Sequence, residues 1–165
     1  TQLVYWGPLS SVSPPPPWAF TTRGLLEYAD GRCGAWGRMF DDCFRTHAIT
    51  SGIVSGIVPI DKPPTLIALA FLVKNWDMTT IPPTDLPGIP GQGNSDPQSS
   101  FADHCVVRYG GNIYDPSYGK LWGAPESLLK WEDGSLDGFV YQDSITGLLV
   151  FLPDTKGVLE TTISP

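Results

Sequence analysis

Residues 104–119 read HCVVRYGGNIYDPSYG. Two runs rich in β-branched and aromatic residues, 104–109 and 112–115, flank the pair Gly110-Gly111. A two-residue Gly-Gly loop between such runs predicts a β-hairpin. We therefore expect two antiparallel neighbouring strands that turn directly back on each other at the glycines.

The register of this hairpin brings a histidine to a carboxylate. A two-residue loop sets Tyr109 opposite Asn112 and Val106 opposite Asp115, and His104 lies two residues before Val106, on the same face. Diagonal neighbours on one face are about 7–8 Å apart, within reach of long side chains. A carboxylate on one ring nitrogen fixes the tautomer and leaves the other nitrogen to accept a proton.

The stretch RCGAWGRMFDDCFRTH, residues 32–47, is typical of an amphipathic helix. At 100° per residue one stripe of this helix carries Cys33, Trp36, Phe40, Phe44 and His47. Cys33 begins the stripe, just after the turn signal Asp30-Gly31. The positive end of a helix dipole favours a thiolate, and free N–H groups at a helix start can bind an oxyanion. Docking of the helix on the sheet is expected to bring Cys33 to the His104–Asp115 face.

The remaining pattern predicts further strands and one short helix. Strands are expected at 3–6, 52–60, 65–73, 138–142, 147–152 and 158–163, and a helix at 125–131. For residues 65–73 a helix remains the alternative to a strand, because periodicity does not distinguish a strand from a helix in a short apolar run. A long helix followed by antiparallel strands predicts the α+β class, with the helix packed on an antiparallel β-sheet.

The length of 165 residues indicates a single domain, 1–165, with two proline-rich segments. Residues 1–20 form an N-terminal arm whose four consecutive prolines favour an extended polyproline II conformation. This arm either lies on the domain or presents a ligand for an SH3-type module. Residues 81–100 hold five prolines and three glycines, which predicts a loop insertion without regular structure. Because the loop leads into His104, we expect it to be mobile or to act as a lid.

Three motifs together resemble the transglutaminase-like (papain-type) cysteine hydrolase superfamily. GRCGAWGRMFDDCFR, residues 31–45, is similar to the family's Gly-x-Cys at the start of a helix, in the version found in peptide N-glycanases. In residues 104–119 a His opens one strand and an Asp-Pro closes the next, as in the family. GIVSGIVPI at 52–60 resembles the strand that follows the family's catalytic helix. The match covers about residues 30–120 and implies a transglutaminase-like, papain-like core.

The resemblance implies a catalytic triad of Cys33, His104 and Asp115. Cys33 is then the nucleophile of a hydrolase or acyl transferase that acts on amide bonds as a protease, deamidase or transglutaminase-type enzyme. His104 serves as general base and then general acid, and Asp115 orients it. The implied substrate is a protein or peptide, and no metal or organic cofactor is implied. Two alternatives remain: an inactive binding or structural module of this fold, and a deamidating toxin domain excised from a larger bacterial protein.

The sequence departs from the family pattern in two places. Gly34 follows Cys33 where the family often has an aromatic residue. The upstream side chain that contributes to the family's oxyanion site is not obvious, and Trp18 and Tyr28 are the candidates. Both departures concern activity more than fold.

The other chemistry-bearing residues have structural interpretations. We expect Cys43 and Cys105 to be core thiols, Cys105 pointing away from His104 by strand alternation. A zinc site is the competing interpretation, but its ligands lack the usual pairwise spacing. They would be Cys33, Cys43, His47, His104 and Cys105. For Asp115, a plain Asp-Pro turn is the alternative.

Composition excludes several partner classes. A net charge of −7 and a pI near 4.5 argue against nucleic-acid and anionic-membrane binding, which need clustered Lys and Arg. No run of about 18 apolar residues predicts a membrane span, and the start TQLVYWG shows no signal-peptide pattern. The absent initiator Met favours a processed, secreted chain or an excised domain of a larger bacterial protein. The oligomeric state is not predicted.

Overall fold

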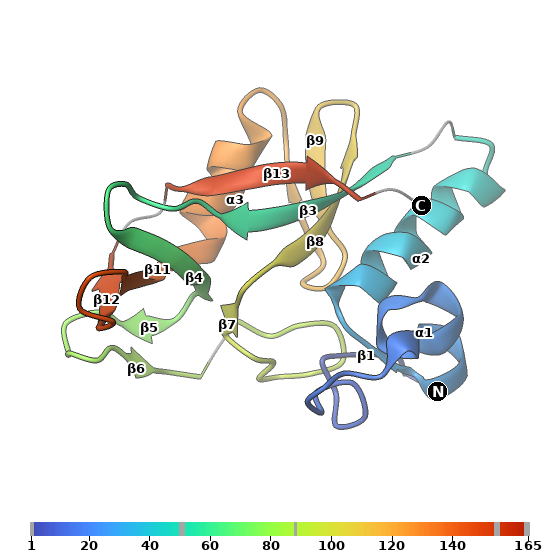
Figure 1. Cartoon of the computed structure of the whole chain (residues 1–165). Helices are drawn as coiled ribbons and strands as arrows, with labels where there is room; N and C mark the ends of the chain where they lie inside the picture. The colour runs from blue at the N-terminus through green and yellow to red at the C-terminus, as the bar shows by residue number, and fades with distance from the viewer. Residues whose placement is uncertain (1, 50–51, 88, 154–155, 164–165) are drawn as a thin grey trace.

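The computed structural model describes residues 2–49, 52–87, 89–153 and 156–163, and it has the predicted α+β class. Its helices and sheets are shown in Figure 1. The helical elements are the 3-10 helix η1 (Pro17–Phe20), α1 (Thr22–Tyr28), α2 (Cys33–Thr46) and α3 (Ser127–Ser135). None of the helices in the described ranges has the length and hydropathy that a membrane-spanning helix needs.

Two antiparallel sheets form the framework of the chain. The first has the order β10-β9-β8-β3-β13, with β10 (Lys120–Trp122), β9 (Asn112–Asp115), β8 (His104–Tyr109), β3 (Ile53–Pro59) and β13 (Val158–Thr162). The second has the order β12-β11-β4-β7, with β12 (Leu149–Leu152), β11 (Leu136–Asp143), β4 (Leu66–Val73) and β7 (Ser100–Phe101). The described residues also form two short ladders: β1 (Val4–Tyr5) with β2 (Asp30–Gly31), and β5 (Trp76–Asp77) with β6 (Thr84–Asp85).

The helix α2 packs against β8 and β3 of the first sheet. A glycine makes this close approach possible, because a Cβ at Gly37 would lie 3.4 Å from Cγ1 of Val54 and 3.8 Å from Cβ of Cys105. Aromatic rings continue the contact, since Phe40 and Phe44 both pack on Tyr114. The predicted docking of the helix on an antiparallel sheet is therefore confirmed.

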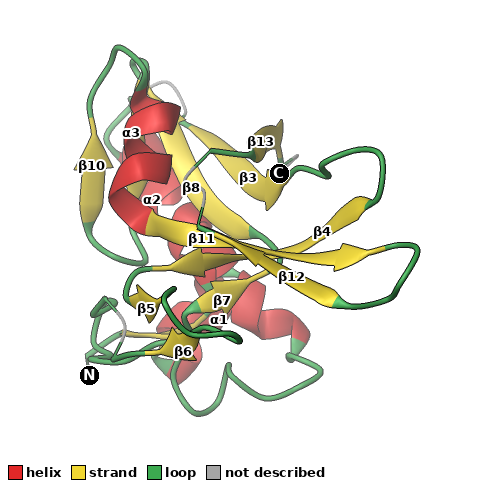
Figure 2. Cartoon of the chain, turned by 90° about the vertical axis from the view of Figure 1, so that its left-hand side faces the viewer, coloured by secondary structure: helices red, strands yellow, loops and turns green. Residues whose placement is uncertain are grey.

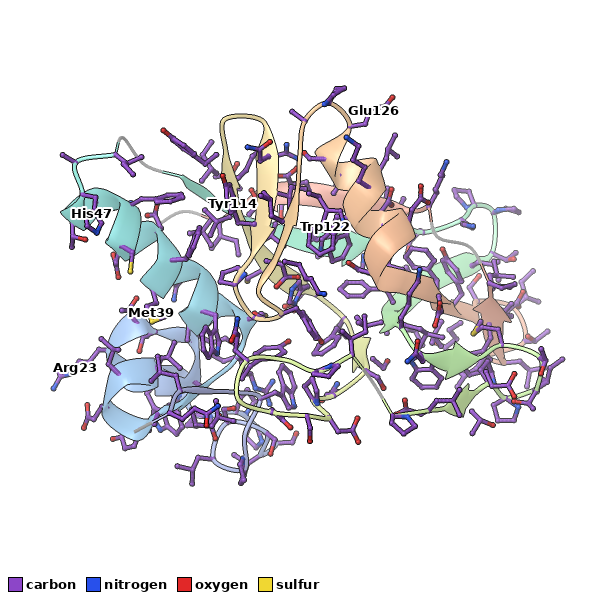
Figure 3. The ribbon with its side chains drawn as sticks, turned by 180° about the vertical axis from the view of Figure 1, so that it is seen from behind. Arg23, Met39, His47, Tyr114, Trp122 and Glu126 are labelled. Carbon is purple, nitrogen blue, oxygen red and sulfur yellow. The ribbon has the colours of Figure 1, made fainter. Side chains whose placement is uncertain are left out.

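The helix α3 contacts β9, β10 and β11, and its place at the edge of the molecule is clear in Figure 2. Trp122 of β10 lies beside α3, so close that a Cβ at Gly134 would meet its indole nitrogen at 2.8 Å (Figure 3). Consecutive residues of a strand point to opposite faces. Because Cys105 meets α2 whereas His104 stacks on Trp131 of α3, the two helices lie on opposite faces of β8.

The hairpin of β8 and β9 has the predicted register. Tyr109 is paired with Asn112, and the next pairs follow without a bulge as far as Val107. Gly110 and Gly111 have φ values of 57° and 79°, the left-handed region that a tight hairpin turn requires and that glycine adopts without a Cβ clash. The glycine pair thus fixes the alignment of the strands that carry His104 and Asp115.

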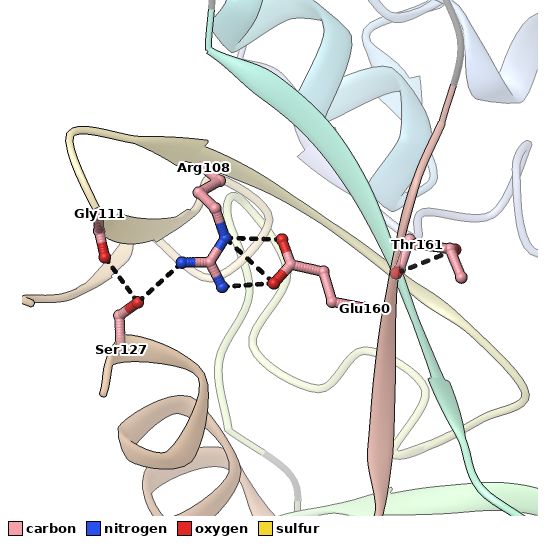
Figure 4. A network of polar contacts seen from close by, with 6 residues as sticks. Arg108, Gly111, Ser127, Glu160 and Thr161 are labelled. Carbon is pink, nitrogen blue, oxygen red and sulfur yellow. Dashed lines mark hydrogen bonds and ion pairs between the residues drawn. The ribbon is translucent and has the colours of Figure 1, made fainter. Parts of the chain in front are cut away.

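A polar network ties this hairpin to its neighbours (Figure 4). Arg108 of β8 donates from Nε to both carboxylate oxygens of Glu160 on β13, at 2.7 and 3.0 Å. Its guanidinium also donates to Ser127 Oγ at the start of α3, and that hydroxyl donates to the carbonyl oxygen of Gly111 at 2.7 Å. The hairpin is thereby held to a strand on one side and to a helix on the other.

Several sequence predictions are confirmed, and others need correction. Residues 65–73 form strand β4 rather than a helix, and the remaining predicted strands are present. The predicted helix at 125–131 begins later, at Ser127, and runs to Ser135. The segment 81–100 is not wholly irregular, because it contains β6 and the first residue of β7; residue 88 lies outside the described part. The helix α1 was not predicted; Thr21 caps it by accepting a hydrogen bond from Gly24 N at 3.0 Å.

Candidate active site

Cys33 is the first residue of α2, as predicted, and the turn before it is anchored by a buried carboxylate. The oxygens of Asp30 accept hydrogen bonds from the backbone N–H groups of Gly7, Leu9 and Ser10 and from the Ser10 hydroxyl. This cluster binds the N-terminal segment to the turn that leads into α2. The start of the helix, and with it the Cys33 side chain, is therefore held from a distant part of the sequence.

His104 and Asp115 are in direct contact, which confirms the proximity predicted from the hairpin. The Nε2 atom of His104 lies 2.7 Å from Oδ2 of Asp115, and the two residues are only 1% and 2% exposed. Asp115 also accepts a hydrogen bond from the indole N–H of Trp131 at 3.3 Å and one from the backbone N–H of Tyr118 at 3.3 Å. The carboxylate is thus fixed by groups outside its own hairpin.

The environment of His104 favours the imidazolium form. Burial of the ring lowers its pKa, but the charge of Asp115 and the hydrogen bond to it, together with Cys33, raise the pKa to about 10. The ring lies almost parallel to the indole of Trp131, with an interplanar angle of 15° and centroids 6.1 Å apart. The stacked indole restricts the orientation of the imidazole.

Cys33 lies next to the same imidazole. The Nε2 atom is bound to Asp115, so Nδ1 is the nitrogen left for the thiol; it is buried and, within the described residues, makes no hydrogen bond of standard geometry. The Cys33 side chain is nevertheless near enough to raise the His104 pKa. The structure therefore brings Cys33, His104 and Asp115 together in the order that the resemblance implies.

The protonation of Cys33 differs from the expectation for a helix start. A hydrogen bond with Cys105, burial and the charge interaction with Cys105 raise the pKa of the Cys33 thiol well above its usual value, although His104 acts in the opposite direction. These directions favour a neutral thiol at Cys33 beside an imidazolium at His104. The pair has to release one proton before the sulfur becomes a nucleophile.

Cys33 opens into a cleft of about 490 Å³. The N-terminal arm forms one wall, and the end of the 81–100 segment with the residues before His104 forms the other. The lining consists of Trp6, Ser11, Ser13, Pro15, Phe20, Arg32, Cys33, Gln98, Phe101, Ala102 and Asp103. A second hollow of about 630 Å³ shares Trp6, Ser11 and Gln98 with it, so the two are neighbours on this face. We refer to the cleft at Cys33 as the groove.

The proline-rich arm lies on the domain, as one of its two interpretations predicted. Arg32, the residue before Cys33, donates from Nε to the carbonyl oxygen of Ser10 at 2.8 Å and from its terminal nitrogen to that of Val12 at 3.1 Å. Its guanidinium also sits 4.1 Å from the ring centroid of Trp6, within the range of a cation–π interaction. One side chain thus couples the arm to the start of α2.

The side chains available to an oxyanion differ from those expected. Trp18 and Tyr28 pack on each other with ring centroids 4.4 Å apart, and the described lining of the cleft includes neither. Trp6 and Gln98, which carry N–H donors, do line it, and the Gln98 amide donates to the carbonyl oxygen of Ser100. Sequence reasoning missed both; the aromatic run at residues 3–6 was the available signal for Trp6.

Two further predictions concern residues away from the cleft. Cys105 is buried as expected, but Cys43 is exposed, so its assignment as a core thiol is wrong. His47 is the C-cap residue of α2 (Figure 3), the helix-end position that the sequence indicated. Within the described ranges, no group of three or more His, Cys, Asp or Glu side chains is arranged to hold a metal ion.

Comparisons with known proteins add no relative. No family model matches the chain, no curated protein matches it, and no solved structure matches it. A function is therefore inferred from the geometry of the cleft and from the residues that line it.

Proposed function

We propose that this chain is a transglutaminase-like, papain-type cysteine hydrolase or acyl transferase that acts on amide bonds of a protein or peptide. One observation carries the proposal: a cysteine at a helix start faces a groove, and behind it stands a buried histidine bonded to a buried aspartate. This is the arrangement that nucleophilic catalysis requires of nucleophile, base and orienting group.

The reaction follows from the roles of the three side chains. Once the Cys33–His104 pair has lost a proton, the sulfur attacks the substrate carbonyl carbon and a C–S bond forms. The imidazolium of His104 donates its proton to the departing nitrogen, the C–N bond breaks, and a thioester remains. Asp115 holds the ring and stabilises its positive charge throughout.

The second half of the reaction regenerates the thiol. Neutral His104 removes a proton from an incoming water or amine, which attacks the thioester carbonyl carbon and displaces the sulfur of Cys33. Water yields a carboxylic acid, and an amine yields a new amide. The first N–H groups of α2 and the N–H group of Trp6, which lines the cleft, are the donors that we assign to the developing oxyanion.

A second candidate function has its own support. The raised pKa of Cys33 and its burial favour a module that keeps this fold and binds a polypeptide without turnover. In that case the groove would bind a segment whose carbonyl group is never attacked. The two candidates differ in whether Cys33 becomes acylated.

Acylation of Cys33 is the decisive test. A glutamine-containing peptide library and its thioester analogues are incubated with the full chain, and the protein is then mapped by mass spectrometry. The enzyme proposal expects an acyl adduct on Cys33, release of amine, and loss of both in Cys33→Ala. Cys43→Ser serves as the matched control, because it removes an exposed thiol from the same helix. Binding of peptides with no adduct and no product supports the binding module instead.

A further inference from the structure

The buried thiol of Cys105 has no part in the proposed reaction, although it is a neighbour of the nucleophile. Both cysteines are reduced, both are buried, and both belong to the same hydrophobic cluster. Gly37 lies one helical turn after Cys33, and a Cβ placed there would be 3.8 Å from Cβ of Cys105. The absent side chain at Gly37 thus lets β8 approach α2 closely and brings Cys105 within one helical turn of Cys33 along that face of α2.

Two consecutive residues of β8, His104 and Cys105, influence the pKa of Cys33. His104 points toward Asp115 and Trp131, and Cys105 points to the opposite face, toward α2. Cys105 is also the first cause of the raised pKa of the Cys33 thiol, so the two side chains interact. A neighbouring thiol in the same buried cluster is positioned to attack an oxidised form of the first.

We propose that Cys33 and Cys105 form a disulfide in the presence of a hydroperoxide, and that this reversible modification switches the active site off. The groove admits the oxidant, because Cys33 lines it whereas Cys105 is absent from its described lining. Cys33 is therefore the residue that is oxidised first, and Cys105 is the one that resolves it. This inference deepens the proposed function and depends on it only for the consequence, loss of turnover.

The chemistry balances with a hydroperoxide as the only co-reactant. The Cys33 sulfur attacks one peroxide oxygen, the O–O bond breaks, and water (or an alcohol, from an organic peroxide) leaves as Cys33 becomes a sulfenic acid. The Cys105 sulfur then attacks the Cys33 sulfur, an S–S bond forms, and a second water departs. Two thiols are oxidised and one peroxide is reduced. A dithiol such as dithiothreitol reverses the change.

The disulfide is tested in the Cys43→Ser chain, in which Cys33 and Cys105 are the only cysteines. After treatment with hydrogen peroxide and blocking with iodoacetamide, a non-reducing peptide map should show the Cys33 and Cys105 peptides linked within one chain. Iodoacetamide labelling of Cys33 should fall at least about tenfold and return with dithiothreitol. Sulfinic or sulfonic acid on Cys33 together with a free Cys105 thiol would overturn the proposal.

A Cys105→Ala chain in the same background separates resolution from simple oxidation. Without Cys105, oxidation of Cys33 should continue to forms that dithiothreitol does not reduce; full recovery in this variant would contradict the role of Cys105. The linkage is read without any substrate, so it is independent of turnover. If the disulfide forms in a chain that shows no amide turnover, the Cys33–Cys105 pair is upheld and the enzyme proposal is rejected. If the chain turns over amides but forms no disulfide, the enzyme proposal is upheld and the disulfide is rejected.

Discussion

The Nε2 atom of His104 lies 2.7 Å from Oδ2 of Asp115, and the two residues belong to different strands of one hairpin. Both are almost fully buried, so the ion pair is shielded from solvent. Burying two charges is costly unless their geometry is good and their remaining polar atoms are bonded. The indole N–H of Trp131 and the backbone N–H of Tyr118 supply those bonds to the carboxylate.

Replacement Asp115→Asn should leave a cooperative fold but remove most amide turnover. The amide no longer stabilises an imidazolium, and it can hold the ring in the wrong tautomer. In a serine-protease triad the same change costs about 10⁴ in kcat; a thiolate–imidazolium pair relies less on its third member, so we expect a loss of about 10² to 10⁴. Thermal melting and turnover are measured together.

Asp42→Asn is the matched control, because Asp42 is an exposed carboxylate of α2 that accepts a hydrogen bond from Thr22. It should retain turnover within a factor of about two, since surface substitutions are usually mild. An Asp115→Asn chain that melts normally and stays nearly fully active would reject Asp115 as the orienting group. An unfolded variant would instead support the Asp-Pro corner as its main role.

The stability of the wild-type chain relative to Asp115→Asn should depend on pH. The pKa of His104 is about 10 in the folded state and about 6.5 when unfolded. Because the folded pKa is the higher one, the pair's contribution is complete below about pH 6.5 and is lost as pH rises through about 10. Urea unfolding at pH 6, 8 and 10 should show that the difference in the free energy of unfolding between the two proteins shrinks by about 1–3 kcal/mol as pH rises. A constant difference would contradict a charged pair.

The hairpin shows how much of this site the sequence determines. Gly110-Gly111 specifies a two-residue turn, the turn specifies the register, and the register places His104 and Asp115 on one face. Each step is local, so it can be read without tertiary information. The position of Cys33 at the start of α2 is likewise local, since a turn signal precedes an amphipathic stripe.

The remainder of the site depends on contacts between distant segments. The groove joins the N-terminal arm to the residues around Gln98, and no periodicity relates those stretches. The high pKa of Cys33 arises from Cys105, a neighbour supplied by helix–sheet packing. Cys43 was placed in the core by residue type alone, although the buried side of that half of α2 is made by Phe40 and Phe44 on Tyr114.

Alkylation of Cys33 by iodoacetamide should accelerate as pH rises, because its pKa is raised and the thiolate is scarce at neutral pH. The measurement uses the Cys43→Ser chain, since the exposed Cys43 would otherwise dominate the labelling. Peptide mapping between pH 6 and 10 should show Cys33 labelled faster than Cys105, which is absent from the described lining of the groove. Faster labelling of Cys105, or a rate independent of pH, would count against the assignment of Cys33 as nucleophile.

Glu160→Gln should lower stability at neutral pH by about 1 kcal/mol, because it weakens a partly exposed pair with Arg108. The hydrogen bonds from Arg108 lower the pKa of Glu160. The stability that the ion pair contributes is present above the unfolded-state pKa of Glu160 and is lost as pH falls through its folded-state pKa. The free energies of unfolding of wild type and variant should therefore converge in acid. Glu27→Gln is the control, since Glu27 pairs with the highly exposed Arg23 and should change stability very little. Equal effects of the two substitutions would reject a special role for the network of Figure 4.

Trp131→Phe should separate the orientation of His104 from the stability of the core. The indole is 1% exposed, stacks on His104 and donates to Asp115, so phenylalanine keeps an aromatic face but removes the N–H donor. We expect a stability loss of about 1–3 kcal/mol from the lost volume and hydrogen bond.

If Trp131 had only a structural role, this loss of stability would be the only effect of the substitution. If Trp131 positions the pair, the carboxylate loses one donor and binds its remaining partners, the Tyr118 N–H and the imidazolium, more strongly. An imidazolium that persists to higher pH lowers the pKa of Cys33, so the pH at which Cys33 alkylation becomes fast would then shift downward. Leu128→Ala, which removes another packed side chain of α3, is the control and should lower stability without moving that profile. A Trp131→Phe profile that coincides with wild type would restrict Trp131 to packing.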